Sequence, residues 1–346
     1  MTDFPTSANV RAFEDVIYSK DAGVATVTLN RPKSYNSYAT RTLKELTLAF
    51  QDASWDDAVH VIVFTGSGAR AFCTGGDVKE YEEKYTRRPR DYWKYMGLFR
   101  GYLESILRCG KPTIARLNGM AVGGGNESQL ACDLTVMAEH AYVGQVGTSV
   151  GSVACGGATQ WLPLVVGDKR AREMLFLNSR IPARKALEWG LVNAVAPSVR
   201  LNGAWIDAPT ADQCEKAQAQ KDGFTIDLSK LDEIVAQYAG ALRDKFPECT
   251  RYTKAQVNHL KEEVWNATVG HAQDWLSVHF GAVEPWEGMS AFVEKRKPDF
   301  AGIRRRLAAG ESTEYLHGPY VKSCRKCGAK GLPANFAHCG LCGAGL

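Results

Sequence analysis

Short, almost wholly apolar runs alternate with helical patterns along the first two hundred residues, and this alternation constrains the fold more than any other feature. Four of these runs read as strands: Val24–Leu29, Val59–Thr65, Pro112–Leu117 and Leu134–Ala138. Near-continuous apolar runs are typical of strands that are buried on both faces. Helical patterns stand between them, one beginning at Thr40 as the expected N-cap and another over Asp91–Leu107. The order predicts βαβ units with right-handed crossovers, and hence an α/β fold.

The character of the chain changes after Pro197. Residues 201–227 are polar and interrupted, with a candidate hairpin turn at Leu201–Trp205, whereas residues 228–309 carry amphipathic helical patterns. A linker-like stretch, Gly310–Pro319, precedes the C-terminal tail. We therefore predict four parts, namely a core over residues 1–200, an insertion over 201–227, a helical region over 228–309, and a linker with tail over 310–346.

Composition narrows the class of protein. The chain has 346 residues, of which 45% are hydrophobic and 23% charged, as in globular proteins with a sizeable core. The net charge of +4 is too small to suggest nucleic acid as a partner. No run approaches the ~18 apolar residues of a membrane helix, and residues 1–15 are too polar and acidic for a secretory leader. Six cysteines are scattered singly, which favours a reducing cytoplasm.

Three glycine-rich segments, residues 71–80, 118–127 and 144–160, stand between strand and helix patterns. The first amides of a helix are unpaired, and the missing glycine side chain lets a ligand approach them. Two such loops that face one carbonyl oxygen form an oxyanion hole from backbone N–H groups. Tight turns are the alternative for any single run. A phosphate loop is not predicted, because a Walker lysine and the dinucleotide spacing are both missing.

These segments, together with Asn30-Arg31-Pro32 and Glu287–Lys297, resemble the crotonase (enoyl-CoA hydratase/isomerase) superfamily over roughly residues 12–305. The resemblance implies a ClpP-like ββα superhelix, a helical C-terminal oligomerisation region that gives homotrimers or hexamers, and an acyl-CoA thioester as substrate. By position, Gly76 and Gly124 match the residues whose N–H groups hold the thioester oxygen. Donors that are fixed in advance suit an enolate that develops on a thioester.

The resemblance also implies contacts to coenzyme A. Lys79 and Lys295 match lysines that meet the phosphates and the adenine end, the second often from a neighbouring subunit. Phe292 belongs to the same C-terminal segment and is assigned to the CoA site with them. The basic cluster at residues 87–90 offers further cations for phosphate. Exposed surface residues are the alternative for all of these cations.

Glu127 falls where hydratases of the family carry a catalytic glutamate, which passes a proton to or from the water that attacks the β-carbon. A glutamate favoured by the helix dipole is the alternative. The second glutamate of the two-glutamate hydratases aligns with Gly147, so ordinary two-carboxylate hydration is not expected. Cys155 stands where isomerases and hydrolases place a further acid. It is read as a weak acid, a nucleophile or a small core residue.

A closer resemblance is to one branch of the superfamily, the 6-oxocyclohex-1-ene-1-carbonyl-CoA hydrolases. The segments that carry it are Asp91–Leu107, Gly144–Gly147, the insertion after Pro197 and Ile226–Asp232. That branch hydrates a cyclic enoyl-CoA and then opens the ring, during breakdown of aromatic compounds. It has an aspartate where this chain has Cys155 and a histidine where this chain has Val150. A simple hydratase or isomerase acting on a chain acyl-CoA, and a non-catalytic CoA-binding scaffold, are the alternatives.

Four cysteines crowd into the last 23 residues as two Cys-x-x-Cys-Gly turns with eleven residues between the pairs. The four are Cys324, Cys327, Cys339 and Cys342. Four thiolates in this spacing predict a tetrahedral zinc site, and the segment resembles the short zinc-ribbon family. Disulfides and an iron centre are the alternatives. About 25 residues are too few for an apolar core, so we expect the metal to supply the folding free energy of the tail.

Overall fold

The computed structural model of the chain describes residues 13–314 and 316–346. Most of the polar segment on which the expectation of no secretory leader rests, residues 1–12, lies outside the described residues. Within the described ranges, no helix is both long and apolar enough to cross a bilayer. The chain forms two compact units. Of the described residues, the first contains those up to Asp77, Lys94–Thr148 and Val153–Gln273, and the second contains Val78–Trp93, Ser149–Ser152 and those from Asp274 onward.

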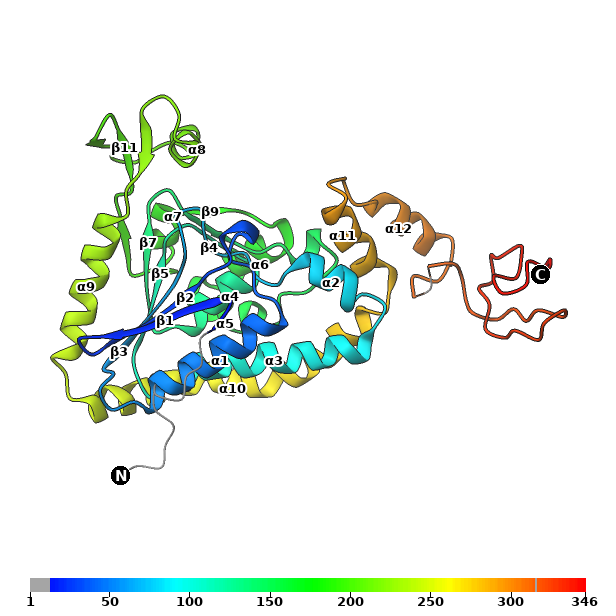
Figure 1. Ribbon diagram of the computed structural model, residues 1–346, viewed down its shortest axis with the longest axis horizontal. Helices are drawn as coiled ribbons and strands as arrows, with labels where there is room; N and C mark the ends of the chain where they lie inside the picture. Colours follow the sequence, from blue (N-terminus) through cyan, green and yellow to red (C-terminus); the bar gives the residue numbers. More distant parts are fainter. Residues whose placement is uncertain (1–12, 315) are drawn as a thin grey trace. The chain divides into compact units, whose positions relative to one another are not determined.

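Six strands of the first unit form one sheet in the order β1-β2-β3-β5-β7-β10 (Figure 1). Their bounds are β1 (Val16–Asp21), β2 (Val24–Leu29), β3 (Val61–Gly66), β5 (Thr113–Leu117), β7 (Leu134–Ala138) and β10 (Ala194–Ala196). Strands β1 and β2 are antiparallel, whereas all the other neighbours pair in parallel. Parallel neighbours need crossover connections, which confirms the predicted βαβ arrangement. The four predicted strands correspond to β2, β3, β5 and β7.

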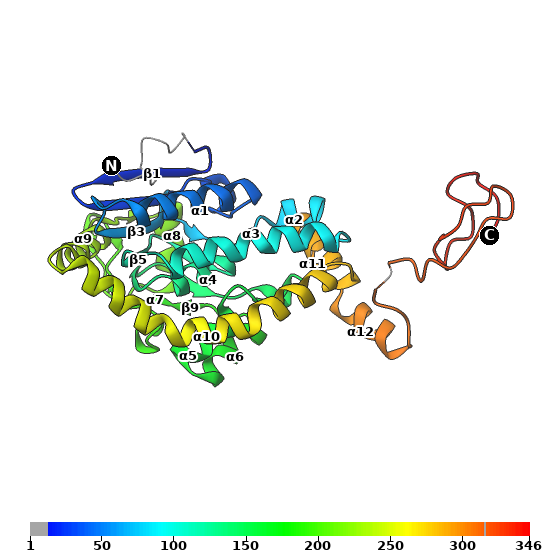
Figure 2. The same cartoon turned by 90° about the horizontal axis from the view of Figure 1, so that it is seen from below.

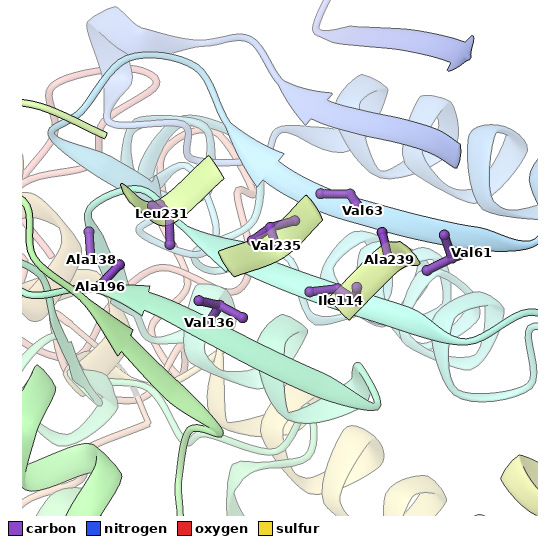
Figure 3. Close-up of a cluster of buried hydrophobic side chains, with 9 residues drawn as sticks. All are labelled: Val61, Val63, Ile114, Val136, Ala138, Ala196, Leu231, Val235 and Ala239. Carbon is purple, nitrogen blue, oxygen red and sulfur yellow. The ribbon is translucent and has the colours of Figure 1, made fainter. Parts of the chain in front are cut away.

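Helix α9 (Ser229–Arg243) covers one face of this sheet. Leu231, Val235 and Ala239 follow one another at intervals of four residues, so they share one side of the helix. They pack against strand residues in a buried apolar cluster (Figure 3), whose strand members are Val61, Val63, Ile114, Val136, Ala138 and Ala196. The first helix after the insertion therefore belongs to the same core as the parallel sheet.

The long helices of the first unit lie against one another. Helix α1 (Thr40–Trp55) begins after Ala39, so the expected N-cap at Thr40 is wrong by one residue; Thr42 Oγ1 accepts the Ala39 N–H at 3.1 Å instead. The parts of α3 (Pro89–Leu107) and α10 (Pro247–His279) in this unit run side by side (Figures 1 and 2). Asn258 Nδ2 donates to the Leu107 carbonyl at 2.9 Å, which satisfies a carbonyl at the end of α3.

The remaining strands form two small sheets. One has the order β4-β6-β8-β9 and the other β12-β11-β13. Their bounds are β4 (Ala71–Cys73), β6 (Met120–Val122), β8 (Tyr142–Gly144), β9 (Ile181–Pro182), β11 (Val199–Leu201), β12 (Ala204–Trp205) and β13 (Phe224–Ile226). Asn202 and Gly203 both have positive φ, 49° and 87°, as a tight two-residue hairpin requires. The predicted hairpin turn is confirmed.

The remaining helices divide between the two units. Those of the first unit are α4 (Gly124–Ala131), α5 (Ala158–Val166), α6 (Asp168–Leu177), α7 (Ala183–Glu188) and α8 (Ala211–Ala219). Those of the second unit are α2 (Val78–Lys84), α11 (Val283–Val293) and α12 (Phe300–Ala308). In the second unit α2 packs on α11, and the rings of Tyr92 and Phe280 stack with centroids 3.4 Å apart. Tyr92 is therefore a packing residue of this unit.

Candidate active site and candidate metal site

The three glycine-rich segments meet at one edge of a small sheet. Strands β4, β6 and β8 are parallel neighbours, and each leads directly into the glycines of one of the segments. The carboxyl ends of parallel strands lie at the same edge, so the loops come together. A side-chain carbon on Gly75 would lie 2.7 Å from the amide nitrogen of Gly124, closer than such atoms can approach. The first two loops are therefore in contact, and this contact requires glycine.

The expected oxyanion donors are the N–H groups of Gly76 and Gly124. The carbonyl oxygens of the same two peptide groups, those of Gly75 and Gly123, accept hydrogen bonds. The Gly75 carbonyl accepts the Tyr38 N–H at 2.9 Å. The Gly123 carbonyl accepts the Glu127 N–H at 3.1 Å and Gln145 Nε2 at 3.3 Å. Because C=O and N–H of one planar trans peptide point in opposite directions, these bonds fix the directions of the Gly76 and Gly124 N–H groups. Such fixed donors are what stabilisation of a developing oxyanion needs.

Glu127 lies in the first turn of α4 and is 4% exposed. Its Oε1 accepts the N–H of Gly156 at 2.7 Å and that of Ala158 at 3.2 Å. Burial raises the pKa of this carboxyl from 4.5 to about 7, although the two N–H bonds oppose the shift. A carboxyl that is stabilised mainly by a helix dipole would have a lowered pKa. Glu127 can instead exchange a proton near neutral pH, as a general acid–base group does.

Cys155 and Gly156 adjoin this carboxylate. Burial, and to a smaller extent the Glu127 charge, raise the pKa of the Cys155 thiol far above its usual value. The thiol therefore stays protonated, which disfavours the nucleophile interpretation. A side-chain carbon on Gly156 would lie 2.1 Å from the Phe99 ring and 2.9 Å from Glu127 Oε2. The close approach of Phe99 and Glu127 thus depends on glycine at position 156.

Sequence reasoning missed Tyr38 at this site. Its hydroxyl lies 1.5 Å from the position that a side-chain carbon of Gly124 would take. Its ring stacks on Phe99, with centroids 5.3 Å apart and planes at 26°. Tyr38 lies between the Asn30-Arg31-Pro32 motif and α1, in no quoted segment, so the sequence carries no local signal for it. Asn30-Arg31-Pro32 itself has a structural part, because Arg31 forms an ion pair with Asp77 at 2.8 Å.

The expected CoA-binding residues belong to the second unit. Lys79 lies in the first turn of α2, with its side chain 74% exposed and 4.0 Å from Glu83. Phe292 lies on α11 and is 60% exposed, and Lys295 follows that helix on the surface. Since α2 packs on α11, the structure brings these three residues into one unit. The first unit gathers the other four, Gly76, Gly124, Glu127 and Cys155.

The second unit also contains a cavity of about 610 Å³ beside α11 and α12. Arg87, Trp286, Arg305 and Arg306 are among its lining residues, and the Arg87 guanidinium lies 6.0 Å from the centre of the Trp286 ring. The volume is in the range of small-molecule sites. One arginine of the basic cluster at residues 87–90 thus faces a cavity.

The tail brings its four cysteines together. Their sulfurs lie within 4.8 Å of one another, and the Cys324–Cys342 and Cys327–Cys339 pairs are each 3.6 Å apart. Tetrahedral zinc with Zn–S bonds of ~2.3 Å places its sulfurs ~3.8 Å apart, whereas a disulfide needs ~2.05 Å. Every cysteine in the described ranges is free, so the disulfide alternative is wrong. The geometry fits a four-thiolate metal site.

The two cysteine turns have the same backbone pattern. Gly328 N–H donates to the Cys324 carbonyl at 3.0 Å, and Gly343 N–H donates to the Cys339 carbonyl at 2.8 Å. Both glycines have positive φ, 75° and 69°, which ordinary side chains disfavour. The Cys327 and Lys326 N–H groups lower the pKa of the Cys324 thiol to about 6, which favours the thiolate that binds metal.

Comparisons with known proteins identify the family of the chain. Residues 19–222 match the Enoyl-CoA hydratase/isomerase family. The chain is 37% identical over 311 residues to 6-oxocyclohex-1-ene-1-carbonyl-CoA hydrolase of Geobacter metallireducens, covering 83% of this chain and 81% of that protein. Its identity to the Thauera aromatica protein of the same name is 36% over 309 residues, covering 82% of each.

A solved structure of an enoyl-CoA hydratase from Mycobacterium avium subsp. paratuberculosis K-10 superposes with a TM-score of 0.66 at 26% identity, covering 84% of this chain and 99% of that one. The expected α/β fold with a helical C-terminal region and a cysteine-cluster tail is confirmed. The chain belongs to the crotonase (enoyl-CoA hydratase/isomerase) superfamily of enzymes.

Proposed function

We propose that this enzyme adds water to a cyclic α,β-unsaturated acyl-CoA of the 6-oxocyclohexene type and then opens the ring by hydrolysis. The observation that carries the proposal is the buried Glu127 carboxyl, with its pKa raised to about 7, beside two peptides whose N–H groups are fixed in direction. The 6-oxocyclohex-1-ene-1-carbonyl-CoA hydrolases at 36% and 37% identity support the choice of substrate. Glycine at position 147 takes the place of the second glutamate of the two-glutamate hydratases, so we assign the proton transfers to Glu127.

In the hydration step the thioester oxygen binds between the N–H groups of Gly76 and Gly124. Glu127 takes a proton from water as the water oxygen bonds to the β-carbon, and the double-bond electrons move onto the thioester as an enolate. Glu127 then returns that proton to the α-carbon. One group acts as base and then as acid, which suits a carboxyl whose pKa is near neutrality. The enolate binds the fixed donors more strongly than the neutral thioester does.

In the ring-opening step Glu127 takes a proton from a second water as the water oxygen bonds to the ring carbonyl carbon. The bond between that carbon and the α-carbon then breaks, its electrons form a thioester enolate, and the α-carbon takes up a proton from the Cys155 thiol, which Glu127 reprotonates. The former ring carbonyl becomes a carboxyl group at the end of the opened chain and releases its proton to solvent. We assign the protonated Cys155 thiol to this step as a weak acid beside Glu127, because its raised pKa keeps the proton on sulfur.

The remaining parts of the proposal concern binding and assembly. Lys79, Phe292 and Lys295 hold the coenzyme A portion, with the lysines meeting its negative charges. The enzyme assembles as a homotrimer or as a hexamer of two trimers through its helical C-terminal region. One zinc ion, held by the four tail thiolates, stabilises the tail. The 3.6 Å sulfur separations support this metal, since they fit a tetrahedral four-sulfur site.

A panel of CoA thioesters followed by mass spectrometry tests the function. The panel contains 6-oxocyclohexene-carbonyl-CoA, cyclohexene-carbonyl-CoA without the ring ketone, and crotonyl-CoA. We expect the ring ketone substrate to gain one water and then a second. Fastest turnover of crotonyl-CoA would identify a simple hydratase, and an isomer of unchanged mass would identify an isomerase. Binding without turnover of any thioester would identify a scaffold protein.

A further inference from the structure

Tyr38 places a buried phenol at the proposed oxyanion hole. We propose that its hydroxyl is a third hydrogen-bond donor to the thioester oxygen, beside the N–H groups of Gly76 and Gly124. The inference rests on the proposed function, in that it takes these two N–H groups to be the donors of the hole.

The position of the hydroxyl follows from the missing side chain of Gly124. A side-chain carbon on this residue would lie 1.5 Å from the Tyr38 hydroxyl oxygen, so the hydroxyl takes the place of that carbon. Gly124 is the first residue of α4. In an α-helix the Cα–Cβ bond tilts toward the N-terminus, and the N–H groups of the first turn point the same way without a helical partner. The hydroxyl therefore lies on the same side of Gly124 as its N–H group.

The rest of Tyr38 fixes this position. Its backbone is tied to the other donor loop, because its N–H donates to the Gly75 carbonyl at 2.9 Å and its carbonyl accepts the Asp77 N–H at 3.0 Å. The ring stacks on Phe99, and the side chain is 1% exposed. One residue thus connects the loop of the Gly76 donor with the helix of the Gly124 donor. A group held in this way needs little reorganisation when charge develops.

A phenol hydroxyl adds a donor without adding a charge. A hydrogen bond to a charged oxygen is roughly twice as strong as one to a neutral oxygen. The hydroxyl therefore stabilises the enolate more than the bound thioester, and such a difference lowers the barrier without tightening substrate binding. If the hydroxyl only filled the space beside Gly124, its loss would lower the stability of the protein. It would then change the binding of the enolate and of the neutral thioester equally.

Tyr38→Phe tests this, because it keeps the ring, the stacking on Phe99 and the backbone bond to Gly75. Removal of one donor from an oxyanion hole typically costs about 10²–10³-fold in kcat; for a third donor we expect a loss of about 10- to 100-fold, with KM changed less than about threefold. Binding supplies a second readout. The enolate of acetoacetyl-CoA, followed by its ultraviolet absorbance, should bind more weakly by a similar factor, whereas butyryl-CoA should bind as before.

Tyr102→Phe is the matched control. Tyr102 belongs to the same ring cluster, with its ring centroid 6.1 Å from that of Tyr38. Its hydroxyl donates to Ser128 Oγ at 2.9 Å. The Tyr102→Phe protein should lose stability as the Tyr38→Phe protein does, and it should keep its affinity for the enolate. Unchanged enolate affinity in Tyr38→Phe, equal losses in both variants, or no enolate on the wild-type protein would overturn the inference. Tyr38-dependent enolate binding without turnover of any cyclic thioester would overturn the proposed substrate alone.

Discussion

The glycine loops of the first unit and the cysteine tail hold their functional atoms in different ways. In the loops these atoms are backbone N–H groups and one carboxylate, and the side chains around them, such as Tyr38 and Phe99, are buried. In the tail they are four sulfurs, of which only those of Cys324 and Cys339 belong to buried residues. The surrounding tail is open, with Leu341 80% exposed.

This difference indicates what stabilises each region. Apolar burial holds the sheet and α9 together before any ligand binds, because the side chains of their shared cluster are buried. The tail buries too few side chains for such a core, so in our proposal the folding free energy comes from the zinc ion held by its thiolates. A change confined to one region should therefore leave the other unchanged, and the unchanged region serves as the reference.

Removal of the metal should have the largest effect. Zinc binding by a short four-ligand segment contributes roughly 10–16 kcal/mol of apparent free energy, so a chelator or the double substitution Cys324→Ser with Cys339→Ser should unfold the tail. The purified protein should carry about one zinc per chain, as elemental analysis will show. Iron in place of zinc would identify the alternative metal centre.

Deletion of residues 320–346 is the companion experiment. It should abolish metal binding and leave the thermal unfolding of the sheet unchanged, because the apolar cluster contains no residue of the tail. Loss of the main unfolding transition on truncation would show that the tail contributes to the main fold.

Glu127→Gln should have the next largest effect. A general acid–base group contributes ~10²–10⁴-fold to rate, and with a single carboxylate present we expect kcat to fall by at least ~10²-fold. The amide oxygen still accepts the Gly156 N–H, so the fold should survive. CoA affinity should change little, since Lys79 and Lys295 are untouched.

Glu45→Gln is the matched control for this substitution. Glu45 is buried and likewise accepts two backbone N–H groups, from Glu14 at 3.1 Å and from Asp15 at 2.8 Å. It should affect stability and leave kcat unchanged. Unchanged turnover in Glu127→Gln on every accepted thioester would remove the central residue of the proposed mechanism.

The sequence alone predicts those strands and helices whose pattern lies within one short segment of the chain. Strands β2 and β7 have the expected bounds, because a buried apolar run is a local property. Strand β1 was not predicted, since its alternating exposure resembles that of a surface segment. Strands β4, β6 and β8 have only three residues each, too few for a pattern. The N-cap of α1 was missed because the capping residue is Ala39, which is not a favoured cap, whereas the neighbouring Thr40 is a favoured type.

The candidate site divides in the same way. Glycine runs and Glu127 stand in recognisable segments of the sequence. Their meeting at one edge depends on the short strands β4, β6 and β8, which the sequence does not predict. The role of Tyr38 and the raised pKa of Glu127 depend on contacts between residues far apart in the chain. A sequence shows which side chains a chain has, but the fold decides which of them meet at a site and burial shifts their charge.

The pH dependence of stability should show the burial of Glu127. Its pKa rises from 4.5 to about 7 on folding, so the folded state binds the proton more tightly than the unfolded state. The contribution of this carboxyl to the free energy of unfolding is fully present below pH 4.5 and is lost as the pH rises through about 7. The shift corresponds to roughly 3 kcal/mol. Relative to wild type, Glu127→Gln should therefore gain stability by this amount between pH 4.5 and neutrality in denaturant titrations. A constant difference across that range would contradict the buried, proton-binding carboxyl.

Cys155→Ala should have the smallest effect and separates the two proposed steps. Hydration should continue at a nearly unchanged rate, because its proton transfers belong to Glu127. Ring opening should slow by about tenfold, equivalent to ~1.4 kcal/mol, as expected when a weak acid is lost and water replaces it. Mass spectrometry over a time course should then show the singly hydrated product accumulating.

Cys132→Ala is the matched control, since Cys132 is equally buried and burial raises the pKa of its thiol to about 12. It should lose stability and leave both steps intact, whereas Cys155→Ser, which keeps a donor, should recover part of the ring-opening rate. If Cys155→Ala leaves both steps unchanged, the thiol only fills space beside Glu127. The proton for ring opening must then come from Glu127 as well, and the site would perform both reactions with backbone donors and one carboxylate.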